Sequence, residues 1–258
     1  MTVDETLLKK IKGQIHAHIF ENPRTLLPFF ADDDMFIDIF ISKTILAALN
    51  TDASVDVWLK DRLRGARLRS RTVRLSSLKQ WKTDGPTGNI VHESGRFFSI
   101  LGLSVRHRRP HGELIWDQPI IDQPEIGILG ILAKRFNGVL HFCLQAKEEP
   151  GNIHAVQLSP TVQATHSNYS RAHGGTLPQF VEYFLSPPPE KVLFAKLQSE
   201  DGGRFLFKSN RNMIVLIDEE IQVPPERFIW LTLRQISDLL KRDNVINACT
   251  RSVLSAVI

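Results

Sequence analysis

The chain has 258 residues and a formal net charge of +4, with 42% hydrophobic and 23% charged residues. This composition is that of an ordinary globular protein, and the length allows one large domain or two small ones. No apolar run approaches the ~20 residues that a membrane-spanning helix needs, and the first residues contain no signal-peptide core. We therefore expect a cytoplasmic protein without a membrane partner.

The two cysteines, Cys143 and Cys249, are too few for a disulfide framework, and Cys143 lies within an apolar run that predicts a buried thiol. Asp32-Asp33-Asp34 has the carboxylates of a magnesium or calcium site, but it lacks the glycine turn and the distal glutamate of a calcium loop. We favour a helix N-terminus for this segment. His16-Ala17-His18 is too isolated to predict a metal site, and we expect none.

Basic residues are concentrated in two segments, residues 62–74 and 106–111. Neutralisation of nucleic-acid phosphates is one interpretation. The two segments lack interleaved aromatic residues, and no helix-turn-helix, zinc-finger or RNP pattern accompanies them. A solvated face, a subunit contact or attraction of a small anionic substrate is therefore favoured over nucleic-acid binding.

The first part of the chain predicts helices, and the part after Gly88 predicts mainly strands. Helices are expected over residues 2–15 and 54–64, followed by a short strand at 71–75 and a helical turn that ends at Trp81. Strands are expected at residues 96–105, 113–121, 128–136, 139–145, 192–198 and 204–208. Further helices are expected at residues 177–185, 232–240 and 245–257.

Local signals support several of these elements. Asn137-Gly138 between two apolar runs predicts a two-residue hairpin turn, and a second hairpin is expected to join residues 192–198 to 204–208. Thr232 and Gln235 have the spacing of a capping box at the start of a helix. The pattern predicts one α+β domain, with a mixed or antiparallel sheet and flanking helices.

Residues 157–175 stand out because they contain almost nothing for a core. The stretch begins like a strand, Pro160 closes that pattern, and Gly174-Gly175 ends the polar run. Amide, phenol, imidazole and guanidinium groups within one short segment suit a polyhydroxylated or phosphorylated ligand. An ordinary polar loop is the alternative.

Several blocks together resemble the NDP-hexose 2,3-dehydratase family. In chain order they are GNIVHESGRFFSI at 88–100, WDQPIIDQPEIGILGIL at 116–132, LQAKEEPGN at 144–152, LQSEDGGRFLFKSNRNM at 197–213, and residues 228–254. The resemblance runs from about Trp81 to Leu254. It therefore divides the chain into an N-terminal helical and strand segment at 1–80, packed on the core, and a dehydratase domain at 81–258.

The resemblance implies a Nudix-like fold, a mixed sheet flanked by helices. The usual member of the family contains two such repeats in tandem, whereas this chain has room for one, which implies a homodimer that reproduces the tandem. Cys249 and Asp201 stand where the family usually has an acidic residue and a glutamine. The glutamate-rich box of Nudix hydrolases is absent, so metal-dependent diphosphate hydrolysis is not expected.

The resemblance also implies a lyase that removes water across C2–C3 of a nucleoside-diphosphate-4-keto-6-deoxyhexose, a step in deoxysugar biosynthesis. We expect a dTDP-linked substrate. No cofactor is required, because the 4-ketone acidifies the C3 proton, and the chain has neither a GxGxxG turn nor a P-loop. Two alternatives stay open: a related elimination or isomerisation on another substrate, and a non-catalytic subunit that binds sugar nucleotides.

Three residues are candidates for the acid, base and enolate-stabilising roles. His173 titrates near neutrality and is the candidate base, and the Tyr169 phenol could donate to the enolate or to the leaving hydroxide. Glu149 directly follows an apolar strand, where partial burial would raise its pKa. The structural alternatives are a turn cap for His173, packing for Tyr169 and a salt bridge from Glu149 to Lys147.

The remaining candidates would bind substrate. Arg96 and Arg211 are the phosphate candidates, with Lys147 next, because guanidinium and ammonium groups pair with phosphate. Trp230 could stack on the nucleobase, with a core role as the alternative. The amide side chains that could bind base, ribose or hexose are Gln118, Gln123, Asn152, Gln163, Asn168, Gln198 and Asn212.

Overall fold

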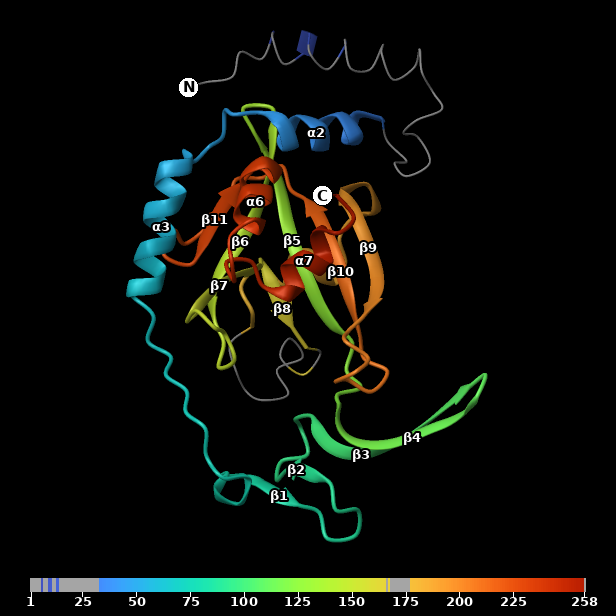
Figure 1. The fold of residues 1–258 in the computed structure, drawn as a ribbon. Coiled ribbons are helices and arrows are strands. Elements are labelled where there is room, and N and C mark those ends of the chain that lie inside the picture. Colours follow the sequence, from blue (N-terminus) through green and yellow to red (C-terminus); the bar gives the residue numbers. More distant parts are fainter. Residues whose placement is uncertain are drawn as a thin grey trace.

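The computed structural model describes residues 33–165, 167 and 177–257, and the isolated positions 6, 9, 10 and 13. The helix expected at residues 2–15 therefore lies almost entirely outside the described residues, as does most of the polar stretch after Thr165. The strands in the described part form a seven-stranded sheet, which contains the core, and a separate four-stranded sheet (Figure 1). The expected α+β class is confirmed.

The seven-stranded sheet is mixed, as Figure 1 shows. Its main path runs β11-β6-β5-β10-β9, in which β10 is parallel to β5 and the other pairings are antiparallel. The strand bounds are β5 Gly127–Phe136, β6 Val139–Glu148, β7 Val156–Pro160, β8 Val162–Ala164, β9 Val192–Ser199, β10 Ser209–Leu216 and β11 Phe228–Leu231.

Strands β5 and β6 pair only near their connecting turn. Ala133–Phe136 pairs with Val139–Phe142, and beyond this point the two strands diverge. The short strands β7 and β8 fill the opening, β7 by pairing with β6 and β8 by pairing with β5. Asn137 and Gly138 in the turn have φ values of 48° and 74°, which confirms the expected two-residue hairpin.

Both faces of this sheet are covered, and β5 is buried from Gly127 to Lys134 for that reason. One face packs against α2 (Asp33–Thr44), α3 (Asp52–Arg64), α6 (Leu233–Leu240) and α7 (Ala248–Leu254). The other face packs against the short helix α5 (Glu182–Leu185). The predicted capping box is confirmed at the start of α6, where Thr232 and Gln235 bond to each other's backbone N–H.

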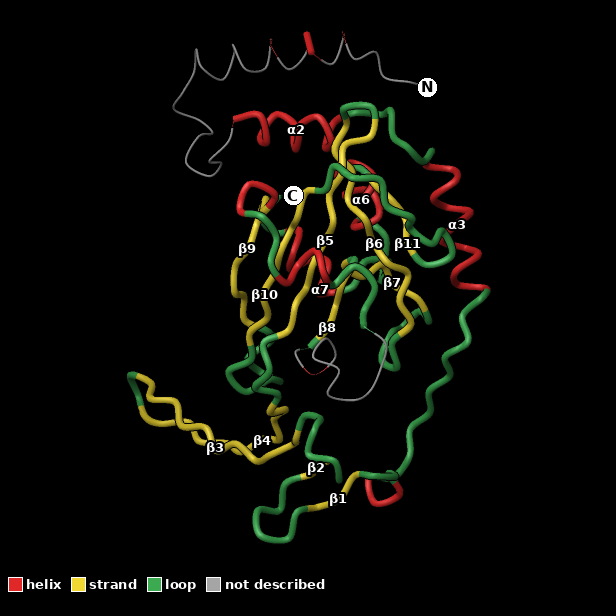
Figure 2. Tube along the Cα trace, turned by 180° about the vertical axis from the view of Figure 1, so that it is seen from behind, coloured by secondary structure: helices red, strands yellow, loops and turns green. Residues whose placement is uncertain are grey.

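The four-stranded sheet forms an arm that projects from the body (Figure 2). Its strands are β1 Trp81–Thr83, β2 Ile90–His92, β3 Ser99–Arg109 and β4 Gly112–Asp122, in the order β1-β2-β3-β4. An extended segment at residues 66–74 leads from α3 to the single-turn 3-10 helix η1 (Leu75–Ser77), just before β1. The base of the arm joins the body where Ile121 forms backbone hydrogen bonds with Arg204 and Leu206.

Several expected elements were wrong or too long. Residues 71–74 form no strand, and Trp81 begins β1 instead of ending a helical turn.

The partner of β9 is β10 rather than residues 204–208, because the buried run of β10 faces the core while Arg204–Leu206 contacts the arm. The expected helix at 177–185 is reduced to α5. The expected helix at 245–257 starts only at Ala248, since Val245 and Asn247 hydrogen-bond to Leu158. A further 3-10 helix, η2 (Pro189–Lys191), precedes β9.

Gly130 in β5 is required by the close packing of α5. A Cβ at this position would lie 2.5–2.7 Å from three ring atoms of Phe184, a side chain that is 1% exposed. We predict that Gly130→Ala lowers the free energy of unfolding by about 1–3 kcal/mol, as overpacking of a filled core does. Urea unfolding measures this change.

Gly102→Ala in β3 is the matched control, because nothing lies within 4 Å of its Cβ. An equal effect of the two substitutions would contradict the packing role of Gly130.

Candidate functional site

A cleft of about 350 Å³ lies at the end of the sheet where β5, β8 and β10 come together. The position follows from the fold, because β8 pairs with the half of β5 that has separated from β6, and its end at Ala164 lines the cleft together with Cys249 of α7. The residues that line the cleft are Gln123, Gly127, Leu129, Lys147, Gln163, Ala164, Thr165, Glu200, Phe205, Lys208, Asn210 and Cys249.

One wall of the cleft is a connected polar network around Gln163. The Gln163 amide donates to Glu149 Oε1 over 3.0 Å, and Lys147 Nζ lies 3.2 Å from the same oxygen. Gln163 Oε1 accepts from Ser159 Oγ at 2.7 Å and from Asn247 Nδ2 at 3.2 Å. Asn247 in turn caps α7 through Thr250 N. The Lys147–Glu149 pair is thus held in place from two strands and one helix, and it presents a carboxylate and an ammonium side by side.

The floor of the cleft contains a lysine, Lys208, that is only 6% exposed. Burial lowers the pKa of this ammonium, although Glu200 and Glu125 act in the opposite direction. The ammonium donates to the carbonyl oxygen of Glu125. Beside it, Asn210 donates to Glu200 and accepts from the backbone N–H of Gly127 at 3.1 Å. These bonds join the start of β10 to the start of β5.

A second pocket of about 370 Å³ adjoins the cleft, and the two share Gln123 and Thr165. It lies between the arm and the body, and its lining includes Arg96, Phe97, Phe98, Glu125 and Ser167. Glu125 Oε2 accepts from Ser167 N at 3.1 Å and from Ser167 Oγ at 2.9 Å. The polar stretch predicted to bind ligand therefore starts at the cleft, where Thr165 lines both pockets.

The structure brings five of the predicted site residues to this region. Gln123, Lys147 and Gln163 line the cleft, Glu149 bonds to two of its wall residues, and Arg96 lines the adjoining pocket. The predicted catalytic residues Tyr169 and His173, with Asn168, lie outside the described residues. Their roles stay predictions.

The other predicted residues lie elsewhere. Gln118 lies in the arm, where its side chain accepts from Trp116 Nε1 and donates to the carbonyl oxygen of Gly203 in the body. Arg211 lines a different pocket beside Phe184. Asn152 donates within its own turn, Gln198 accepts from Ser252, Asn212 is 1% exposed, and Trp230 packs against Phe136 in the core.

The candidate site residues do not include Glu200, Lys208, Asn210 and Cys249, which are polar or ionisable and line the cleft. The sequence predicts Lys208 at the end of a strand at residues 204–208, and the structure has no strand there. A lysine after an apolar run usually lies at a surface, so no local signal distinguished it. The long-range pairing of β10 with β5 brings Lys208 and Asn210 to the cleft.

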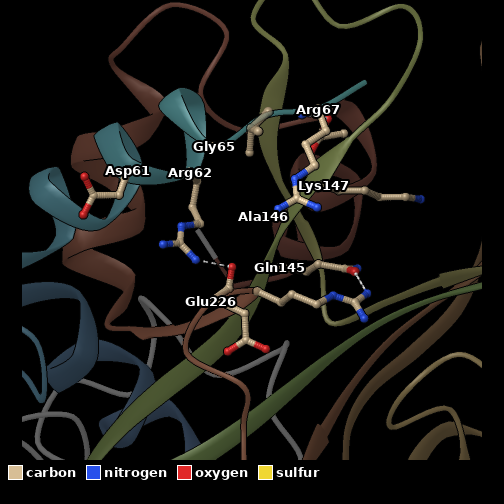
Figure 3. Close-up of a pocket in the computed structure, with 11 residues that line it drawn as sticks. Asp61, Arg62, Gly65, Arg67, Gln145, Ala146, Lys147 and Glu226 are labelled. Atoms are coloured by element: carbon tan, nitrogen blue, oxygen red, sulfur yellow. Dashed lines mark hydrogen bonds between the residues drawn. The ribbon is translucent and has the colours of Figure 1, made fainter. Parts of the chain in front are cut away.

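A larger hollow of about 630 Å³ lies between α3 and the β6–β11 edge (Figure 3). Some of its polar groups form hydrogen bonds that hold the chain together. Glu148 accepts from the backbone N–H of Arg67 and of Leu68, and Arg227 donates to Gln145 at 2.9 Å. These contacts attach the extended segment after α3 to the sheet. The hollow therefore has a structural use, and the cleft is the better candidate for a ligand.

The described residues contain no group of three or more His, Cys, Asp or Glu side chains arranged to hold a metal ion. No helix in the described ranges is long and apolar enough to cross a membrane.

A mixed-sheet α+β domain with a polar cleft at the end of its sheet belongs to the class of small-ligand-binding domains. Residues 52–257 match the model of a family described as NDP-hexose 2,3-dehydratase. The chain belongs to this family, so the resemblance seen in the sequence is confirmed. The match begins at residue 52, well before Trp81, and therefore includes α3 and the segment that follows it.

Three curated relatives are named dTDP-4-dehydro-6-deoxy-alpha-D-glucopyranose 2,3-dehydratase. The relative from Amycolatopsis orientalis is 49% identical over 228 residues, which is 84% of this chain and 48% of that protein. The relative from Saccharopolyspora spinosa is 49% identical over 200 residues, 78% of this chain and 41% of that protein. The relative from Streptomyces violaceoruber is 45% identical over 206 residues, 80% of this chain and 46% of that protein. The chain thus spans about half the length of the curated relatives it matches.

Cys249 provides a chemical probe of the cleft. Burial, with the nearby charges of Glu200 and Glu149, raises the pKa of its thiol to about 11. The reactive thiolate is therefore scarce at neutral pH, and we predict that iodoacetamide alkylates Cys249 on the order of 100-fold more slowly at pH 7.5 than it alkylates an unperturbed cysteine. The rate should rise about tenfold per pH unit up to about pH 10, as measured by mass spectrometry.

Cys249→Ser identifies the labelled residue, because Cys143 is fully buried and should stay unmodified in the folded protein. Alkylation of Cys249 at the rate of a free thiol at pH 7.5 would contradict this environment.

Proposed function

We propose that this chain is a carbon–oxygen lyase that removes water across C2–C3 of a nucleoside-diphosphate-4-keto-6-deoxyhexose, in the cleft beside Gln163. The substrate is proposed to be dTDP-linked, and the enzyme would meet it in the cytoplasm. The observation that carries the proposal is the family membership over residues 52–257, together with a polar cleft that contains Gln123, Lys147 and Gln163. The names of the three relatives support the same reaction.

The reaction needs proton transfers and stabilisation of one negative charge. A base removes the C3 proton, the electron pair passes through an enolate at C4, and the C2 hydroxyl leaves as water after protonation. Tautomerisation then yields the 2-deoxy-3,4-diketo sugar. Glu149 is our proposed group for one of the proton transfers, because its carboxylate contacts Lys147 and Gln163, two residues that line the cleft. His173 as base and Tyr169 as donor complete the proposal. The Nudix-like fold stays a prediction with which the mixed sheet is compatible.

A second candidate follows from the length of the chain. Because the chain spans about half of its relatives, it could bind the nucleotide sugar without turning it over. Turnover assays separate the two candidates.

The experiment is incubation of the purified protein with dTDP-4-keto-6-deoxyglucose, a 3-ketoreductase and NADPH. We expect NADPH consumption and a 2-deoxy product, identified by mass spectrometry. His173→Ala and Tyr169→Phe should each reduce turnover by at least ~100-fold while dTDP binding is kept, because both changes remove only an acid–base group.

Binding of dTDP without any turnover would favour the binding subunit. Neither binding nor turnover would favour a related elimination on another substrate. Near-normal rates in both variants would refute the two catalytic assignments.

We propose further that the arm packs against a second copy of the chain in a homodimer. Strands β3 and β4 each contain 11 residues, about 36 Å of extended chain. One face of the ribbon is mainly apolar: it contains the opposed pairs Leu101–Ile120 and Val105–Trp116, while Leu103 and Leu114 oppose the polar residues Gln118 and His107. Trp116 is 39% exposed and Leu114 is 41% exposed.

Such a ribbon needs a partner, because a two-stranded hairpin alone is marginally stable and an amphipathic ribbon normally covers a core. The relatives contain a further stretch of about equal length that could supply this cover within one chain. We propose that a second copy of the chain supplies it. The basic residues 106–109 at the tip of the arm would then lie at the subunit contact, which was one of the uses expected for them.

We predict that the protein has twice the 29.3 kDa mass of one chain in light scattering. Val105→Glu should shift it to the monomer, because a carboxylate would be buried on the apolar face of the ribbon.

Ser104→Glu is the matched control, since Ser104 pairs with Asp117 on the opposite face of the same strand. It should leave the dimer intact. A monomeric wild-type protein, or a dimeric Val105→Glu variant, would overturn this arrangement.

A further inference from the structure

Lys208 is a buried cation whose bonding is incomplete. Its side chain lines the cleft, and only 6% of the residue is exposed. In the described part of the chain its ammonium donates one hydrogen bond, to the carbonyl oxygen of Glu125, and has no carboxylate within ion-pair distance. An ammonium has three donors, so up to two of them remain for a ligand in the cleft.

The nearby carboxylate of Glu200 is engaged elsewhere. The Glu200 carboxylate accepts a hydrogen bond from the side chain of Asn210. The backbone N–H of Glu200 donates to the carbonyl oxygen of Lys208 at 2.9 Å. Glu200 therefore forms no ion pair with Lys208. Burial lowers the pKa of the lysine, and the charges of Glu200 and Glu125 oppose this change only in part. A buried cation in this situation favours an anionic ligand, because burying a charge is costly unless it is paired.

The other cations near the cleft are placed differently. Lys147 already pairs with Glu149, and Arg211 lines another pocket next to Phe184. Arg96 lies in the adjoining pocket rather than in the cleft itself. Among the described residues that line the cleft, Lys208 is the cation without a carboxylate in direct contact.

The kind of anion follows from how long its charge persists. An enolate exists only during turnover, so it cannot balance the ammonium while the substrate is first bound. A diphosphate is charged throughout binding and catalysis, and its oxygens accept hydrogen bonds from ammonium groups. The persistent charge is the better match for a cation that is buried at all times.

We propose that Lys208 binds the diphosphate of the nucleotide sugar at the floor of the cleft. This inference rests on the proposed function, and it adds a phosphate-binding residue that the sequence did not single out. The Glu125 carbonyl fixes the ammonium, and the Glu125 carboxylate holds Ser167 at the start of the polar stretch.

The test compares dTDP with thymidine by isothermal titration calorimetry on wild type and on Lys208→Met. We expect the variant to bind dTDP at least about 10-fold more weakly, since it loses a charged hydrogen bond, while thymidine affinity changes less than about twofold. Lys208→Arg should keep part of the preference for dTDP. A variant that is structurally damaged would lose both ligands together, which would count against the proposal.

Lys196→Met is the matched control, because Lys196 is an exposed lysine on β9 outside the cleft. It should bind both ligands like wild type. If Lys208→Met does not fold, pyrophosphate binding to the wild-type protein decides, since it should compete with dTDP and slow the alkylation of Cys249 in the same cleft.

The two proposals fail in different ways. If wild type turns over the sugar nucleotide but Lys208→Met keeps the full preference for dTDP over thymidine, the role of Lys208 is wrong and the lyase function stands. If wild type shows neither turnover nor dTDP binding, the proposed function itself is overturned. Pyrophosphate that neither competes with dTDP nor protects Cys249 would also overturn the role of Lys208.

Discussion

The divergence of β5 from β6 is the constraint on which the rest of the structure depends. These strands pair over four residues on each side of a tight turn and then separate, so the backbone groups of their outer halves need other partners. Strands β7 and β8 supply these partners, and β10 completes β5 on its other side. The cleft lies where these short strands end. A sheet paired along its whole length would leave no such opening.

The cleft contains one ion pair, Lys147–Glu149, and one buried cation, Lys208, that forms no ion pair among the described residues. Lys147 and Glu149 neutralise each other, and Gln163 and Asn247 fix their positions through bonds to β7, β8 and α7. Lys208 is buried with a single hydrogen bond and with glutamates near but not paired to it. The wall around Gln163 is therefore held by several hydrogen bonds, whereas the floor has an excess positive charge at Lys208. That contrast is compatible with the proposed binding of an anionic nucleotide sugar.

The arm has an apolar surface that the described residues do not fully cover. Its long ribbon has an apolar face that the described part of the body leaves partly exposed, and the chain spans about half of its curated relatives. The adjoining pocket lies between the arm and the body, so whatever covers the ribbon would also border the site. In the proposed homodimer, assembly would therefore affect this pocket, which Arg96, Phe97 and Phe98 of the arm line together with Glu125.

Local signals in the sequence determined the elements that depend on a few adjacent residues. Asn137-Gly138 predicted the β5–β6 turn because a positive φ is needed there, and Thr232 with Gln235 predicted the start of α6. Characteristic blocks identified the family, and they contain Gln123, Lys147 and Glu149, whereas Gln163 was found in the polar stretch 157–175. Only the tertiary structure decided that β9 pairs with residues 209–216, that Trp230 packs in the core and that Lys208 reaches the cleft. The reason is physical: strand register and burial depend on which apolar face meets which partner across the whole chain, and that choice cannot be made within one segment.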